Sequence, residues 1–448
     1  MSDTNLEGQI ERWRTFVQRH ETIAPADVDE LEDHMRGQVE DLRATGLSDD
    51  EAFLIAIGRL GNLDAVSREF AREHSERLWK QLALVPRETP EGSSPAWRDL
   101  AVALGCAVGA GVAVKAGGTW IHPEEVFVRN VGLLVLPFVA AYFAWRRKAS
   151  LRLWLSLAAA FAVMAVVLNV YPYPADSSTG LLAALHAPVL LWLVVGVAYV
   201  AGSWLSDDKR MDFARFTGEQ AIYYALIAMG GGVLTGLTAG VLSVLGADLE
   251  TVLGDWVMPF AVPGAFIVAA WLVEAKKSVV ENLAPVLTKL FTPLTIVMLL
   301  AVLVVLATSG DLSRVDRQAL IVMDAILILV ECLLLYAISA RDPLVRTGVF
   351  DVLQLALVVV ALAVDAVMLA AIVSRIAEFG SSPNKLATLG VNLLLLVHLA
   401  GTAWVELGFL RGRRSFAALE RWQTRYLLVY GAWALVVVVG FGPLFRWV

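Results

Sequence analysis

The sequence predicts an all-α protein: a polytopic transmembrane helical bundle of about eleven spans, preceded by a small cytoplasmic helical domain. Three observations lead to this fold class. Of the 448 residues, 58% are hydrophobic, whereas soluble globular chains contain about 45–50% apolar residues. Apolar stretches of about 20 residues, enough to cross a bilayer, follow one another from residue 97 onward. Loops rich and poor in positive charge alternate along this region, as they do in multi-pass proteins.

Composition and motifs exclude several classes of function. The net charge of −7 disfavours a nucleic-acid partner, because such a partner selects a basic face. The sequence has no P-loop, no HExxH, no GxSxG and no cluster of cysteine and histidine ligands. Cys106 and Cys332 lie in separate apolar stretches, which argues against a disulfide framework. We therefore expect a protein without enzymatic activity, cofactor or metal.

Residues 1–85 have the pattern of a small helical domain, and their polar start is not that of a cleavable signal peptide. Apolar residues recur at helical spacing, Ser48-Asp49-Asp50-Glu51 forms a capping box, and Gly46 and Gly61 suit helix ends. These signals predict helices at Gln9–His20, Asp27–Thr45, Ala52–Leu60 and Asp64–Leu84. Residues 86–96, which contain proline, glycine and serine, form a linker to the transmembrane domain at residues 97–448.

One run of this domain resembles a known family. LEDHMRGQVEDLRATGLSDDEAFLIAIGRLGNLDAVSREF, from Leu31 to Phe70, is similar to the helical prefix called the HAAS or permease-prefix domain. In that family the module precedes bacterial membrane-spanning regions, is often encoded beside PadR-type transcription regulators, and is assumed to signal or regulate. The resemblance implies a bacterial plasma-membrane protein with a cytoplasmic N-domain, and it implies no catalytic residue. One interpretation of this domain is a regulatory module that engages a cytoplasmic protein partner. The alternative is a bundle that only caps the cytoplasmic face.

The membrane region itself carries a weaker resemblance. The runs RFTGEQAIYY and WLVEAKKSVVENLAPVL look like parts of the uncharacterised membrane regions that follow this prefix in actinobacteria. This similarity implies no activity.

Eleven apolar stretches are long enough to span a bilayer. We place them at about 99–117, 126–145, 152–171, 181–204, 219–245, 255–273, 287–308, 318–339, 350–374, 386–409 and 424–445. Loops rich in lysine and arginine, such as 146–152 and 411–421, alternate with poor loops, such as 172–180 and 247–255. Because positive loops stay in the cytoplasm, we expect the N-terminus inside and, after an odd number of spans, Val448 outside.

Glycine and proline mark the middles of the fifth and sixth spans. Gly230, Gly231 and Gly232, and likewise Pro263 with Gly264, are candidates for helix breaks. In transporters, paired breaks expose helix ends that bind substrate or ions, whereas simple kinks are the alternative.

Two further features concern packing and loops. Gly232, Gly236 and Gly240 are spaced for close helix approach, either within the chain or in a dimer, so the oligomeric state stays open. The segments Ser206–Thr217 and Glu274–Pro285 are predicted as cytoplasmic loops, the first of which also suits a short interfacial helix.

Acids and one histidine lie inside the eighth, ninth and tenth apolar stretches. Asp324 and Glu331 belong to the eighth span, Asp365 to the ninth, and His398 with Glu406 to the tenth. A charged side chain at the centre of a bilayer costs about 2.5–3.5 kcal/mol on insertion scales, so these groups should face protein or water. Asp324 and Glu331 are seven residues apart and therefore share one helix face.

Asp351 and Asp365 are fourteen residues apart, which predicts an acidic stripe on the ninth span, and His398 supplies a titrating group at the depth of Asp365. Such a cluster favours a permease-like transporter or channel that uses buried acids to couple to protons or cations. Two alternatives to this interpretation stay open. In the first, the acids are neutral, hydrogen-bonded structural groups. In the second, the whole protein is a membrane-anchored sensor, signalling protein or scaffold.

Overall fold

The structure is a computed structural model that describes Ile10, Pro25–Ala44, Ala52, Ala56 and the ranges 96–244, 250–275, 283–308, 317–341 and 347–448. The chain divides into two compact units, Met1–Ser93 and Ser94–Val448. The described residues form helices joined by short turns, and none of them lies in a strand. The prediction of an all-α fold is therefore confirmed.

In the first unit the structure describes one helix, α2 (Pro25–Ala44). Its apolar residues recur at intervals of three and four, so they line one face of the helix. That face joins a small buried core made of Ile10, Met35, Val39, Leu42, Ala52 and Ala56. Apart from Ile10, Ala52, Ala56 and Ala96, the other three helices predicted for residues 1–85 and the linker at 86–96 lie outside the described residues, as does most of the run that resembles the permease-prefix domain.

Eleven helices of the second unit are long and apolar enough to cross a membrane within the described part of the chain, which confirms the predicted multi-pass class. The first six are α6 (Ala96–Trp120), α7 (Glu124–Arg146), α8 (Leu151–Val170), α9 (Ser178–Tyr199), α10 (Asp207–Val244) and η1 (Leu253–Val257) continuing into α12 (Met258–Ala275), with the short α11 (Glu250–Val252) before η1. The other five are α14 (Leu283–Thr308), α15 (Arg317–Ser339), α16 (Val349–Phe379), α17 (Pro383–Leu410) and the continuous run α18 (Phe416–Leu435), η3 (Val436–Gly440) and α19 (Phe441–Leu444).

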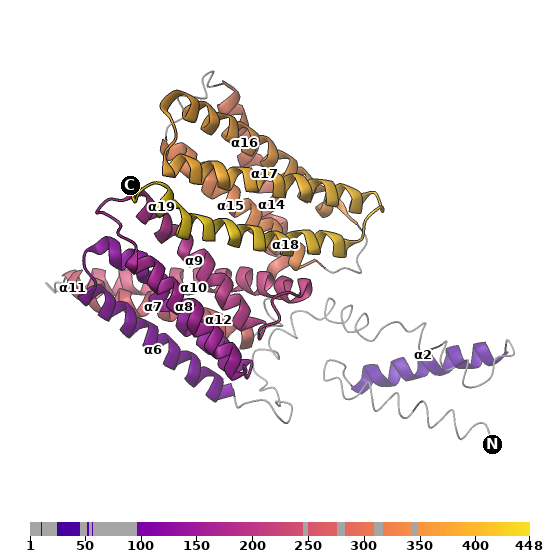
Figure 1. Ribbon diagram of the computed structural model, residues 1–448. Coiled ribbons are helices and arrows are strands. Elements are labelled where there is room, and N and C mark those ends of the chain that lie inside the picture. Colours follow the sequence, from indigo (N-terminus) through magenta and orange to yellow (C-terminus); the bar gives the residue numbers. More distant parts are fainter. Residues whose placement is uncertain are drawn as a thin grey trace. The chain divides into compact units, whose positions relative to one another are not determined.

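The spans form two groups, with α18 between them (Figure 1). Helices α6 to α10 and α12 share one core, whose largest buried side chains include Tyr142, Phe143 and Phe216. Helices α14 to α17 share a second core around Leu327 and Leu399. Helix α18 packs on α9 and α10 of the first group and on α17 of the second.

Contacts between helix ends show which loops lie together. At one end, Arg146 at the end of α7 pairs with Glu274 near the end of α12. We call this the basic end, because the loops 147–150 and 411–415 there are rich in arginine and lysine; the uncharged loop 200–206 lies at the same end. At the opposite end, the N–H of Thr179 donates to the carbonyl oxygen of Val448.

The structure corrects the first predicted loop and the two ends of the second. Ser206–Thr217 lies almost entirely in α10, which begins at Asp207. This first part of α10 is amphipathic and buries Phe213 and Phe216 against protein. Its other face is polar, and the mean hydropathy of the segment is therefore too low to mark it in the sequence as part of a span. Glu274 lies in the last turn of α12 rather than in a loop, and residues 276–282 lie outside the described residues.

The helix-break candidates do not interrupt their helices. Helix α10 continues through Gly230, Gly231 and Gly232, although each glycine costs about 1 kcal/mol of helix propensity. In lipid the backbone groups must bond to one another, which keeps such a helix intact. Helix α12 also continues through Pro263 and Gly264, and the irregular part of this span is the π-helical η1.

Close packing through glycine occurs in the first span but not in the fifth. A Cβ at Gly109 of α6 would lie 2.6 Å from Cε1 of Phe138 in α7. At Gly232, Gly236 and Gly240 no described atom would lie within 4 Å of a Cβ, so these glycines do not bring α10 close to another helix that the structure describes.

Candidate functional site

Asp324 on α15 is held by an amide on α17. The Nδ2 atom of Asn392 donates to Oδ1 of Asp324 at 2.8 Å and to the carbonyl oxygen of Thr388 at 2.9 Å. Asn392 is fully buried, so this hydrogen bond joins two spans through polar groups inside the bundle. The environment of Asp324 is that of a hydrogen-bonded acid.

Glu331 lies about two turns further along α15, opposite His398 of α17. The Oε1 atom of Glu331 is 2.9 Å from Nδ1 of His398, and both side chains are buried. Nδ1 is also 3.0 Å from the hydroxyl of Tyr430 on α18, and its alignment suits a hydrogen bond to Tyr430 rather than to Glu331. The imidazole ring stacks on Tyr426 at 4.2 Å between centroids. Three helices therefore fix the orientation of this acid–histidine pair.

Asp365 on α16 is 0% exposed, and neither of its carboxyl oxygens has a hydrogen-bond partner among the described residues. It is close enough to Asp324 and to Tyr430 to interact electrostatically with both. An unpartnered buried polar group costs about 1–3 kcal/mol in proteins. Packing alone therefore does not explain an acid at this position.

Glu406 is separate from this cluster, and Asp351 lies too far along α16 from Asp365 to belong to it. Arg341 donates from Nε to Oδ1 of Asp351 at 2.7 Å, and the N–H of Gly348 donates to Oδ2 at 2.7 Å. Fourteen residues of helix span about 21 Å, so Asp351 shares a face with Asp365 but lies at the basic end. Glu406 is buried within electrostatic range of Asp351.

The helix-break candidates take no part in this cluster. Gly230, Gly231 and Gly232 in α10 have no described atom within 4 Å of a Cβ position. Pro263 and Gly264 lie in α12, which packs on α6 and α10 in the other group of spans.

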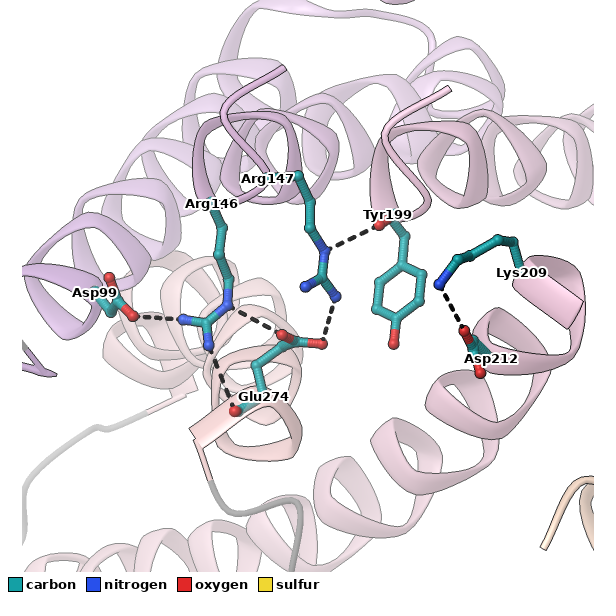
Figure 2. A network of polar contacts seen from close by, with 7 residues as sticks. All are labelled: Asp99, Arg146, Arg147, Tyr199, Lys209, Asp212 and Glu274. Atoms are coloured by element: carbon teal, nitrogen blue, oxygen red, sulfur yellow. Dashed lines mark hydrogen bonds and ion pairs between the residues drawn. The ribbon is translucent and has the colours of Figure 1, made fainter. Parts of the chain in front are cut away.

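A second constellation, which the sequence did not predict, lies at the basic end (Figure 2). Glu274 accepts hydrogen bonds from Nε of Arg146 and from Nη2 of Arg147, each at 3.0 Å. Arg146 also reaches Asp99 of α6 at 2.5 Å, and Arg147 donates from Nε to the carbonyl oxygen of Tyr199 at 3.0 Å. The Glu274 side chain is only 1% exposed. This buried charge therefore joins the ends of four helices.

A pocket of about 380 Å³ lies beside this network, between α7, α9, α10 and α12. In Figure 2 the ring of Tyr199 lies between the Arg147–Glu274 pair and the Lys209–Asp212 pair. The guanidinium of Arg147 is 4.9 Å from the centre of this ring. The charged residues that line the pocket are Arg147, Lys209, Arg215, Asp212 and Glu219, and the other lining residues are Tyr199, Val200, Ala201, Phe216 and Val273.

The sequence held one signal of this network. In the run WLVEA, Glu274 is a single acid at the end of an apolar span, where a buried acid needs a cation. Its partner Arg146 is 128 residues away in the chain, so no local pattern identifies the pair. In the sequence, Arg146 and Arg147 indicate only a loop rich in positive charge.

These two constellations can support different chemistry. The acids and histidine of α15 to α17 can exchange a proton or bind a cation, whereas the pocket at the basic end offers both charges to a polar ligand. Within the described ranges, no group of three or more His, Cys, Asp or Glu side chains is arranged to hold a metal ion. No family model matches the chain, and comparisons with curated proteins and with solved structures give no match either.

Proposed function

We propose that this multi-pass membrane protein is a permease-like transporter that couples to protons or cations at Asp324, Glu331, Asp365 and His398. One observation carries the proposal. Asp365 is fully buried among the spans, and both of its carboxyl oxygens lack a partner among the described residues. A bound cation or an exchanging proton supplies the missing partner, which gives a reason to keep an acid where an apolar side chain is more stable.

The neighbouring side chains support the same function. Glu331 and His398 form an acid–histidine pair, and Tyr430 contacts His398 and lies within electrostatic range of Asp365. Histidine is the side chain whose charge changes most readily near neutral pH. The cluster therefore combines an unpartnered acid with an adjacent group that can take up or release a proton.

The test is a flux assay in proteoliposomes that contain a pH-sensitive dye and face gradients of H⁺, Na⁺ or K⁺. Asp365→Asn keeps the size of the side chain and should abolish the coupled flux without changing folding. Glu378→Gln, at an exposed position on the same helix, is the matched control and should transport like the wild type. If Asp324→Asn, Glu331→Gln and Asp365→Asn all leave the pH and cation responses unchanged, the proposal is wrong.

We also propose that the first unit is a cytoplasmic regulatory domain and that the membrane is a bacterial plasma membrane. The resemblance of Leu31–Phe70 to the permease-prefix domain supports this assignment, and so does the division of the chain at Ser93. A protein that begins at Ser93 should still insert into membranes and carry the flux, with altered regulation. A wild-type protein that carries no flux but captures a cytoplasmic partner through residues 1–93 would favour the alternative of a sensor or scaffold.

A further inference from the structure

The pocket beside Tyr199 lies at the ends of several spans. Its residues from α7, α9 and α12 are at the ends of those spans, namely Arg147, Val200, Ala201 and Val273. Helix α10 has 38 residues and is about 57 Å long, whereas the hydrocarbon core of a bilayer is about 30 Å thick. Helix α10 is therefore longer than the hydrocarbon requires, and its charged first turns, which line the pocket, are the part suited to the level of the lipid head groups.

The pocket has both positive and negative side chains along one face of α10. Lys209, Asp212 and Glu219 lie on one face of α10, at intervals of three and seven residues. Lys209 and Asp212 pair at 3.3 Å while about half of each side chain remains exposed, so the pair is weak and open to exchange. A ligand with one negative and one positive group can replace this pair by two stronger contacts.

The arginines of the pocket have donors to spare. Arg147 uses Nε and Nη2 for Tyr199 and Glu274, and Arg215 uses Nε and Nη2 for the carbonyl oxygen of Ser339. The Nη1 groups of both arginines donate no hydrogen bond to any residue that the structure describes. Guanidinium groups of this kind bind phosphate oxygens well.

We propose that this pocket binds a lipid head group that carries a phosphodiester and a primary ammonium, as phosphatidylethanolamine does. The phosphate contacts the cationic side chains of Arg147, Lys209 and Arg215. The ammonium contacts the carboxylate of Asp212, which lies on the same face of α10 as Lys209. The ring of Tyr199 covers the ethylene carbons and offers its face to the ammonium. This inference concerns a separate site and does not depend on the proposed transport function.

The test uses the full-length protein in detergent and its melting temperature, Tm, with added lipid. Phosphatidylethanolamine should raise the Tm by several degrees, and phosphatidylglycerol by less than half as much, because it lacks the ammonium. Asp212→Asn should remove the difference between the two lipids. Lys209→Gln should reduce the response to both. Both variants should fold, because an exposed pair contributes little to stability.

Matched controls lie at the same end of the protein but outside the pocket. Asp208→Asn and Arg413→Gln change exposed charges and should leave the lipid responses at the wild-type values. Equal effects of the two lipids on the wild type, or no effect of phosphatidylethanolamine, would overturn the proposal. A shift in Tm of the same size with glycerophosphoethanolamine would overturn the assignment to lipid, because the pocket would then bind the same charged groups on a soluble compound.

Discussion

Glu331 and His398 face each other across two transmembrane helices, with 2.9 Å between Oε1 and Nδ1. The imidazole is held from the other side by Tyr426, which stacks on it, and by the hydroxyl of Tyr430. His398 belongs to α17, the orientation of its ring is set by α18, and its acidic partner comes from α15. Because both side chains are buried, their interaction is little screened by solvent.

A double-mutant cycle tests this pair. Glu331→Gln and His398→Asn should each lower the stability of the protein in detergent by about 1–3 kcal/mol. The double variant should lose less than the sum, with a coupling energy of about 0.5–3 kcal/mol, because each single change already breaks the interaction. A control cycle of His398→Asn with the exposed Glu378→Gln should be additive. Additivity for Glu331 and His398 as well would contradict the contact.

Asp365 should respond to mutation in the opposite direction. Asp365→Val removes a buried carboxyl group that has no hydrogen-bond partner among the described residues, at a modest cost in packing. We expect the variant to be as stable as the wild type or more stable by about 1 kcal/mol, and to carry no coupled flux. Thermal unfolding in detergent measures the first effect and the proteoliposome assay the second. A loss of more than about 2 kcal/mol would show that the carboxyl group is satisfied after all.

The sequence predicts the number of spans well, because length and hydropathy are the quantities that decide whether a helix crosses a bilayer. It predicts the start of α10 poorly, because the turns after Asp207 carry exposed charges and bury Phe213 and Phe216 against protein rather than lipid. It also finds the acids of α15 to α17 but not their partners. No local sequence pattern marks Asn392 or Tyr430 as partners. Helix packing brings Asn392 to Asp324 and Tyr430 to His398.

Close packing of α17 and α18 gives a third prediction. A Cβ at Gly401 would overlap the indole ring of Trp422, whose Nε1 donates to the carbonyl oxygen of His398 at 3.1 Å. Gly401→Ala should therefore destabilise the protein by about 1–3 kcal/mol. Gly236→Ala, in α10 with no described atom within 4 Å, is the matched control and should be neutral or stabilise by up to about 1 kcal/mol. Equal melting temperatures for the two variants would contradict this packing.

Glu274 is the centre of the network at the basic end, and its removal should cost more than that of any surface acid. In Glu274→Gln, Arg146 keeps Asp99 and Arg147 keeps the carbonyl oxygen of Tyr199, but the shared carboxylate is lost. We expect a loss of about 2–4 kcal/mol, measured by thermal unfolding in detergent. Glu378→Gln is the exposed control and should change stability by less than about 0.5 kcal/mol. A similar effect of both changes would mean that solvent already satisfies the arginines.

The orientation of the whole bundle gives the last prediction. Ala175 lies in the exposed turn between α8 and α9 at the end opposite the basic end, and Ser415 lies in the exposed turn between α17 and α18 at the basic end. Because loops rich in arginine stay in the cytoplasm, Ser415 should be inside and Ala175 outside. In a protein without Cys106 and Cys332, an impermeant maleimide added to intact cells should label Ala175→Cys and not Ser415→Cys. Both should be labelled once the cells are permeabilised. Labelling of Ser415→Cys from outside intact cells would reverse the orientation and place the pocket beside Tyr199 in the outer leaflet.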